Sequence, residues 1–164
     1  MSGVRGLYGA LADISMTFLT EAGAQQVVTG YDLHELKEKW ERPDLPCRLI
    51  LPMEEYNAVS AGVPEPMSVG STGVLGLMTW NVVDLMLWKE VGQGRGLQDH
   101  LPDMVRYAGQ YIEQIMNHTN PMPHMQLARV APNIGVYEFP VGTDRKYYGV
   151  EVQLSFEEII NPSG

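Results

Sequence analysis

The chain has 164 residues, of which 45% are hydrophobic and 19% are charged, and its net charge is −9. This length suits one domain with a core of its own, spanning residues 1–164, and the composition excludes a disordered chain. The negative charge argues against a surface that binds nucleic acid by neutralising phosphates.

The first part of the chain predicts a long helix over Val4–Ala22, with Gly23 as its C-cap. Hydrophobic residues recur there at helical spacing, at Leu7, Leu11, Ile14 and Phe18. Polar residues interrupt this stretch, which argues against a signal peptide. We interpret Ala24–Tyr31 as a polar connector and Asp32–Trp40 as a short charged helix that opens with a capping box.

The middle of the chain predicts strands around a long loop. A short buried strand is expected over Arg48–Leu51, closed by Pro52. Residues Met53–Gly76 are rich in Gly, Pro, Ser and Glu and lack periodicity, so we expect a functional loop or one that a partner orders. After it, Met78–Trp88 is apolar on both faces, which predicts a long strand covered on both sides for part of its length.

The second long helix is expected from about Pro102 to Asn117, after a glycine-rich turn over Gly92–Gly96. One continuous apolar stripe marks it, formed by Leu97, Leu101, Val105, Ala108, Ile112 and Ile115.

Two strands joined by a hairpin are expected to close the chain, over Gln126–Phe139 and Lys146–Phe156. Pro132 in the first of them predicts a bulge or an edge position. In the second, alternation predicts a buried face and a polar face, and the buried face contains Val150, Val152, Leu154 and Phe156.

The element order is therefore helix, strand, strand, helix, strand, strand. It predicts an α+β fold with a mostly antiparallel four- to five-stranded sheet and two long helices packed on one face.

The sequence contains no recognisable motif for a catalytic, metal or cofactor site. The four histidines form no metal-binding pattern, and Gly92–Gly96 lacks the lysine that a phosphate-binding loop requires. No carboxylate pair is placed for acid–base catalysis. Cys47, the only cysteine, lies in an apolar run that predicts a buried, inert thiol. No apolar run reaches the length of a membrane helix. We therefore expect a protein that is not an enzyme.

Three segments, "LPCRLILP", "LQDHLPDMVRYAGQYIEQI" and "YYGVEVQLSFEEI", occur in an order that resembles the tail-terminator and neck proteins of long-tailed bacteriophages. The resemblance implies a structural virion protein, assembled in the host cytoplasm, that forms a hexameric ring. Such a ring caps the tail tube, binds a head-closure or connector protein and lets DNA pass through its centre. An acidic lumen would suit that passage, because it repels DNA.

The long loop and the last strand supply the candidate interface under this hypothesis. In the loop we expect Pro64, Met67 and Val69 to face the tube or a neighbouring subunit. On the polar face of the last strand we expect Glu151 and Gln153 to contact the ring or the tube.

Three alternatives remain open from the sequence. The first is a head-closure, neck or minor tail protein, which would have a different partner and equally little chemistry. The second is a small enzyme whose site forms between subunits from His100, Asp103 and Arg106. The third is a monomeric ligand-binding module with a pocket between Trp80 and Trp88.

Overall fold

A computed structural model describes the protein over residues 4–32, 45–52, 68–69, 76–92, 96–139 and 145–160. Within these ranges two helices and seven strands are found. They are α1 (Val4–Ala12), β1 (Met16–Leu19), β2 (Gln25–Asp32), β3 (Cys47–Pro52), β4 (Ser68–Val69), β5 (Gly76–Glu90), α4 (Leu97–Ile115), β6 (Met125–Glu138) and β7 (Lys146–Ile160).

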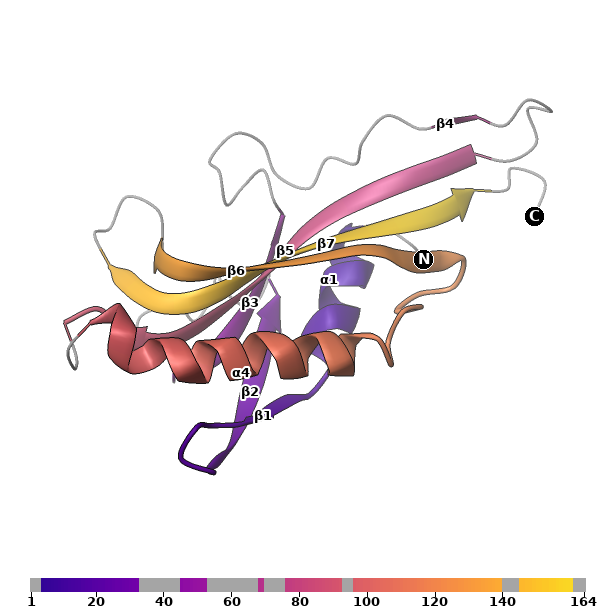
Figure 1. The fold of residues 1–164 in the computed structure, drawn as a ribbon. Helices are drawn as coiled ribbons and strands as arrows, with labels where there is room; N and C mark the ends of the chain where they lie inside the picture. The colour runs from indigo at the N-terminus through magenta and orange to yellow at the C-terminus, as the bar shows by residue number, and fades with distance from the viewer. Residues whose placement is uncertain are drawn as a thin grey trace.

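The strands form one mixed sheet in the order β1-β2-β3-β5-β7-β6, with β4 paired to the start of β5. The β2–β3 pair is parallel, and the other pairs are antiparallel. Figure 1 shows β5, β7 and β6 side by side as long curved strands, with α4 running along one side of them.

The expectation of a mostly antiparallel four- to five-stranded sheet with two long helices is wrong. The described part of the chain is mostly sheet, and seven strands take part in it. Of the two helices in the described residues, α4 is long, with 19 residues, whereas α1 has nine. The predicted order also fails, because strands occupy the stretch that was assigned to the end of the first helix and to a connector.

The error at the first helix has a physical reason. Ile14, Met16 and Phe18 are all buried, and they follow one another at the spacing of a strand as well as fitting the end of a helical stripe. The tertiary structure uses the strand spacing, because β1 turns at Gly23, with φ of 86°, and pairs with β2. The stretch interpreted as a polar connector is β2 itself, half-exposed near the edge of the sheet.

The main core lies between the helices and one face of the sheet. Val150, Val152, Leu154 and Phe156 of β7 have no exposed surface, which confirms the predicted buried face of that strand. Each such side chain contributes about 1.5–3 kcal/mol through burial. Phe18 joins the layers, because its ring meets Trp88 and Tyr107 edge-on at 5.5 and 5.4 Å between centroids.

A second apolar cluster occupies the opposite face of the sheet. Its buried members are Cys47, Leu49, Leu51, Val83, Leu85, Leu87, Tyr137 and Tyr147. The cluster explains why β3 and β5 are apolar on both faces, as the sequence predicts for the longer strand. Cys47 is buried, as expected.

The apolar residues of α4 are divided between two sides of the helix. The side against the sheet buries Met104, Tyr107, Ala108, Tyr111 and Ile115. The remaining members of the stripe marked in the sequence, Leu97, Leu101, Val105 and Ile112, are exposed. Of the predicted stripe, only Ala108 and Ile115 contribute to the core.

The short charged helix expected over Asp32–Trp40 and the hairpin turn at positions 140–144 lie almost wholly outside the described residues, as does most of the loop Met53–Gly76.

Candidate functional site

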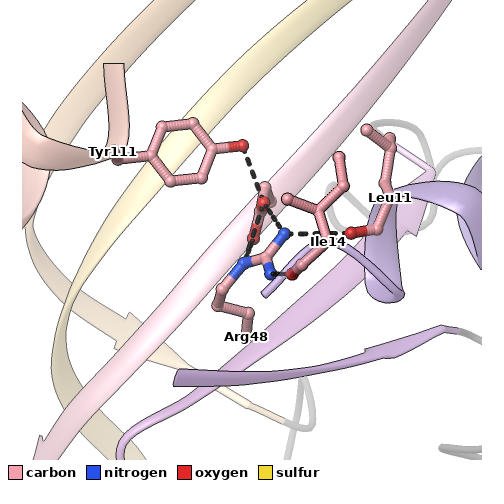
Figure 2. Close-up of polar contacts among 5 residues, drawn as sticks. Leu11, Ile14, Arg48 and Tyr111 are labelled. Atoms are coloured by element: carbon pink, nitrogen blue, oxygen red, sulfur yellow. Dashed lines mark hydrogen bonds and ion pairs between the residues drawn. The ribbon is translucent and has the colours of Figure 1, made fainter. Parts of the chain in front are cut away.

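A buried ion pair lies at the centre of the molecule. Arg48 on β3 and Asp84 on β5 have no exposed side-chain surface, and Arg48 Nη2 lies 2.7 Å from Asp84 Oδ2. Arg48 Nε also donates to both carboxylate oxygens at 3.1 Å. Tyr111 of α4 donates its hydroxyl to Asp84 Oδ2 at 2.7 Å. Figure 2 shows how these groups point toward one another.

The same guanidinium binds the C-terminal end of α1. Arg48 Nη1 donates to the carbonyl of Ile14 at 2.7 Å, and Nη2 donates to the carbonyl of Leu11 at 3.2 Å. The last carbonyls of a helix have no partner within the helix and carry partial negative charge, so a buried cation there supplies both a donor and a favourable charge. Arg48 thereby ties α1, β3, β5 and α4 together (Figure 2).

The electrostatics of the site keep Arg48 protonated. Burial, the largest single effect, would by itself lower the pKa of Arg48. The charge of Asp84, the hydrogen bonds to Asp84 and the nearby Tyr107 and Tyr111 together outweigh it, and the pKa is raised above its usual value. Because neither side chain reaches the surface, no substrate can approach this pair. We therefore interpret the cluster as structural.

The edge of the sheet at β1 is covered by side chains of α4. The side-chain oxygen of Gln114 accepts from the N–H of Thr17 at 2.9 Å, and its Nε2 donates to the carbonyl of Thr17 at 2.6 Å. Gln110 does the same for Leu19, at 2.9 and 3.2 Å. Two turns before Gln110, Asp103 accepts from the N–H of Glu21 at 2.8 Å. The backbone groups that β1 would offer to another strand are therefore already occupied.

The other edge of the sheet is β6, and no strand of the described part lies beyond it. The N–H of Phe139 donates to the carbonyl of Arg145, so the backbone groups of Phe139 point toward β7. In an antiparallel pair every second residue directs its N–H and carbonyl to the partner strand, and the residues between direct theirs away from it. By this alternation the N–H groups of Val130, Ile134 and Val136 point away from β7. Pro132 stands at another outward position, so its edge placement is confirmed.

The predicted interface residues fall in different settings. Pro64 and Met67 lie outside the described residues. Val69 lies in β4 and is paired with Gly76 at the start of β5. Glu151 on β7 is only 7% exposed, and its Oε1 accepts from Gln153 Nε2 at 2.9 Å. The structure thus brings together Glu151, which is buried, and Gln153, which is half-buried.

The residues of the alternative hypotheses serve structural roles in the described part of the chain. Asp103 binds the backbone at Glu21, and Arg106 binds the carboxylate of Glu21 at 2.8 Å. Trp80 and Trp88 are both buried in the helix-side core. Trp80 also donates to Glu158 Oε1 at 3.1 Å, so its indole nitrogen has a partner within the fold.

The described residues contain neither a metal-binding cluster nor a helix that could span a membrane. No group of three or more His, Cys, Asp or Glu side chains is placed to hold a metal ion. Within the same residues, no helix has the length and apolarity that a membrane crossing requires.

A cavity of about 530 Å³ lies where the loop between α4 and β6 meets the end of β7. His124 in this loop has φ of 63°, a conformation that is uncommon for residues other than glycine. Its carbonyl accepts from the N–H of Ile159, which fixes the loop against β7. The cavity is lined largely by loop residues and contains no cluster of catalytic groups.

Sequence reasoning missed the Arg48–Asp84 pair, although a signal for it exists. Each residue is the one charged member of an apolar run, "CRLIL" and "VVDLML". Two opposite charges inside buried strands predict pairing, since an unpaired buried charge is very costly. The glutamines of α4 carry no comparable signal, because Gln110 and Gln114 also fit an ordinary exposed helix face.

A scan against protein-family models and a search of curated proteins each find no match to this chain.

Proposed function

We propose that this chain is a structural subunit of a tailed-phage virion, a tail terminator that assembles as a ring on the end of the tail tube. The observation that carries the proposal is the contrast between the two edges of the sheet. Side chains of α4 occupy the edge at β1, whereas β6 presents the outward N–H groups of Val130, Ile134 and Val136, beyond Leu127, whose N–H donates to the carbonyl of Thr119.

An open edge of this length requires an explanation. Unpaired backbone groups on a long strand are a template for pairing with another chain, and proteins usually cover or interrupt them. Pro132 removes only one of the outward donors. A neighbouring subunit that pairs with β6 through a different surface of its own would satisfy the rest, and a head-to-tail contact of this kind forms a ring when the rotation from one subunit to the next closes.

The charge of the chain supports the same proposal. A net charge of −9 opposes adhesion of DNA, which suits a subunit whose ring surrounds a passing genome. Val69 on β4 and the loop that contains Pro64 and Met67 remain the proposed contacts with the tube. Glu151, which is buried, and Gln153, which is half-buried, would support the neighbouring interface from the sheet.

The test is to mix the purified chain with short tubes of the tail tube protein from the same phage system and to image them by negative-stain electron microscopy. We expect rings at tube ends and an end to tube elongation. Tubes that elongate unchanged and carry no ring would refute the proposal. A ring that binds the head connector in place of the tube would assign the chain to the head-closure class.

Val136→Pro and Val136→Ala form a matched pair for the edge contact. Proline removes an outward N–H, and it leaves the hydrogen bonds between β6 and β7 in place. Alanine shortens the same side chain and keeps the N–H. We expect the proline variant to lose ring formation and the alanine variant to retain it. Equal behaviour of the two variants would exclude β6 as the contact.

A further inference from the structure

An apolar stripe runs along the exposed side of α4. Its members are Leu97 (39% exposed), Leu101 (40%), Val105 (53%), Ile112 (37%) and Met116 (57%). Scattered single hydrophobic residues on a surface need no explanation, but five in line on one helix form a contiguous patch. Helical spacing places them on the flank away from Gln110 and Gln114, which bind β1.

Four of the five members of the stripe are spaced symmetrically about one centre, and Leu97 lies outside this pattern. The midpoint falls between positions 108 and 109, with Val105 and Ile112 three and a half positions to either side. Leu101 and Met116 lie seven and a half positions to either side. A pattern that is the same in both directions along a helix is complementary to a reversed copy of itself, as a two-fold interface requires.

The residues at the midpoint are the smallest ones of the helix. Glycine weakens a helix interior relative to alanine, so Gly109 needs a reason. A Cβ added there would meet nothing within 4 Å, and the packing of this chain therefore does not require glycine. Gly109, which is exposed, leaves a shallow place where a second helix can approach closely, because the distance between helix axes depends on the side chains at the contact.

We propose that a second copy of this chain docks on the stripe, with the two α4 helices antiparallel and crossing at Gly109. In this arrangement Val105 of each copy packs against Ile112 of the other. Leu101 of each copy packs against Met116 of the other, so that the large side chains flank the crossing point on both sides. The contact extends over about 24 Å of helix.

This inference does not rest on the proposed ring. A two-fold contact joins two subunits and closes, whereas a ring needs two different surfaces on each subunit. The α4 contact therefore describes how the free chain pairs, and the β6 contact describes how subunits join around a tube.

Light scattering coupled to size-exclusion chromatography tests the pairing. We expect a concentration-dependent dimer, and we expect Val105→Glu to raise its dissociation constant at least about 10-fold, since a charge would be buried in an apolar contact. The control is Val27→Glu, which alters a 60% exposed valine on β2 and should leave the dimer intact. A wild-type chain that stays monomeric up to about 1 mM would overturn the inference.

Cross-linking tests the antiparallel geometry. The double variant Val105→Cys/Ile112→Cys should oxidise to a covalent dimer, because each new cysteine meets the other position on the second copy. The two positions are about 10 Å apart within one helix, too far for a disulfide inside the chain. Each single variant should give little dimer, and the buried native Cys47 should not react. A dimer formed equally by the single variants would refute the antiparallel crossing.

The two proposals fail separately in these experiments. A dimer without any ring on tube ends would refute only the proposed function. Rings that form while the chain shows no α4-dependent dimer would refute only the pairing.

Discussion

Arg48 and Asp84 form an ion pair between adjacent strands, with Arg48 Nη2 2.7 Å from Asp84 Oδ2 and no exposed surface on either side chain. Removing both charges from water has a large desolvation cost, which the attraction and the surrounding hydrogen bonds offset. Removing one partner of the pair should therefore destabilise the fold much more than replacing both.

Asp84→Ala should lower the free energy of unfolding by about 3–5 kcal/mol, because it leaves the Arg48 guanidinium charged and buried without its partner. Urea denaturation followed by circular dichroism measures the change. Arg106→Ala is the matched control, since Arg106 and Glu21 form an exposed pair at a similar distance, 2.8 Å. The control should change stability by about 0–1 kcal/mol. Similar losses in the two variants would show that burial does not set the cost.

Tyr111→Phe should destabilise the protein by about 1.5–3 kcal/mol, because its hydroxyl donates to the charged carboxylate of Asp84 at 2.7 Å. Tyr107 offers a control in the same helix. Its hydroxyl is buried and has no hydrogen-bond partner among the described residues, so Tyr107→Phe should leave stability unchanged or raise it. Denaturation curves of both variants decide the matter, and an equal loss in the two would contradict the assigned role of Tyr111.

Gly149→Ala should strongly reduce stability or prevent folding. Gly149 on β7 pairs with Leu87 on β5, and a methyl group there would overlap the carbonyl oxygen of Met86. Gly135→Ala is the control, because Gly135 lies directly opposite on β6 and a methyl group there would make only ordinary contacts with Tyr137. Thermal melts of both variants test the pair. A variant at Gly149 as stable as the one at Gly135 would show that β5 and β7 can separate at no cost.

The sequence predicted individual strands better than it predicted their assembly. The alternation of Val150, Val152, Leu154 and Phe156 has one physical explanation, and the structure buries all four. The stretch from Ile14 to Phe18 fits two periodicities, and only pairing with β2 selects the strand. The parallel β2–β3 pair leaves no local mark on the sequence, so the sheet order could not be predicted.

The surfaces of α4 illustrate the same limit. Its stripe was visible in the spacing from Leu97 to Ile115, but spacing does not tell which side of a helix faces the sheet. Large aromatic side chains settle this in the structure, because Tyr107 and Tyr111 pack into the core and the aliphatic residues turn outward. In the sequence, only Pro132 indicated that β6 lies at an edge of the sheet.

Alkaline conditions should destabilise the fold above about pH 10. Burial, with a further contribution from the charge of Asp84, raises the pKa of Tyr107 and of Tyr111 well above the usual value. Burial and the nearby Glu151 raise the pKa of Tyr137 to about 12. A raised pKa in the folded state means that the stabilising effect is fully present below about pH 10 and is lost as the unfolded tyrosines ionise at higher pH.

Denaturation series at several pH values between about 9 and 11 measure this loss, which should be about 1.4 kcal/mol per pH unit for each fully buried tyrosine. Tyr107→Phe should make the decline shallower by one such contribution. A decline of the same steepness in the variant would contradict the assignment to Tyr107.

The double variant Gln110→Ala/Gln114→Ala should uncover the edge of β1. Each glutamine both accepts from and donates to the backbone of one β1 residue, at Leu19 and at Thr17. Each lost hydrogen bond should reduce stability by about 0.5–1.5 kcal/mol, partly offset by the higher helix propensity of alanine. The uncovered backbone groups should also promote association through the edge. Static light scattering of concentrated samples, together with urea denaturation, measures both effects.

Glu113→Ala is the control for the change in helix propensity, because Glu113 is an exposed position on the same helix. This variant should neither lose stability nor associate. If the double variant were as stable and as dispersed as this control, the glutamines would not be what keeps β1 from pairing, and the contrast with β6 would lose its physical basis.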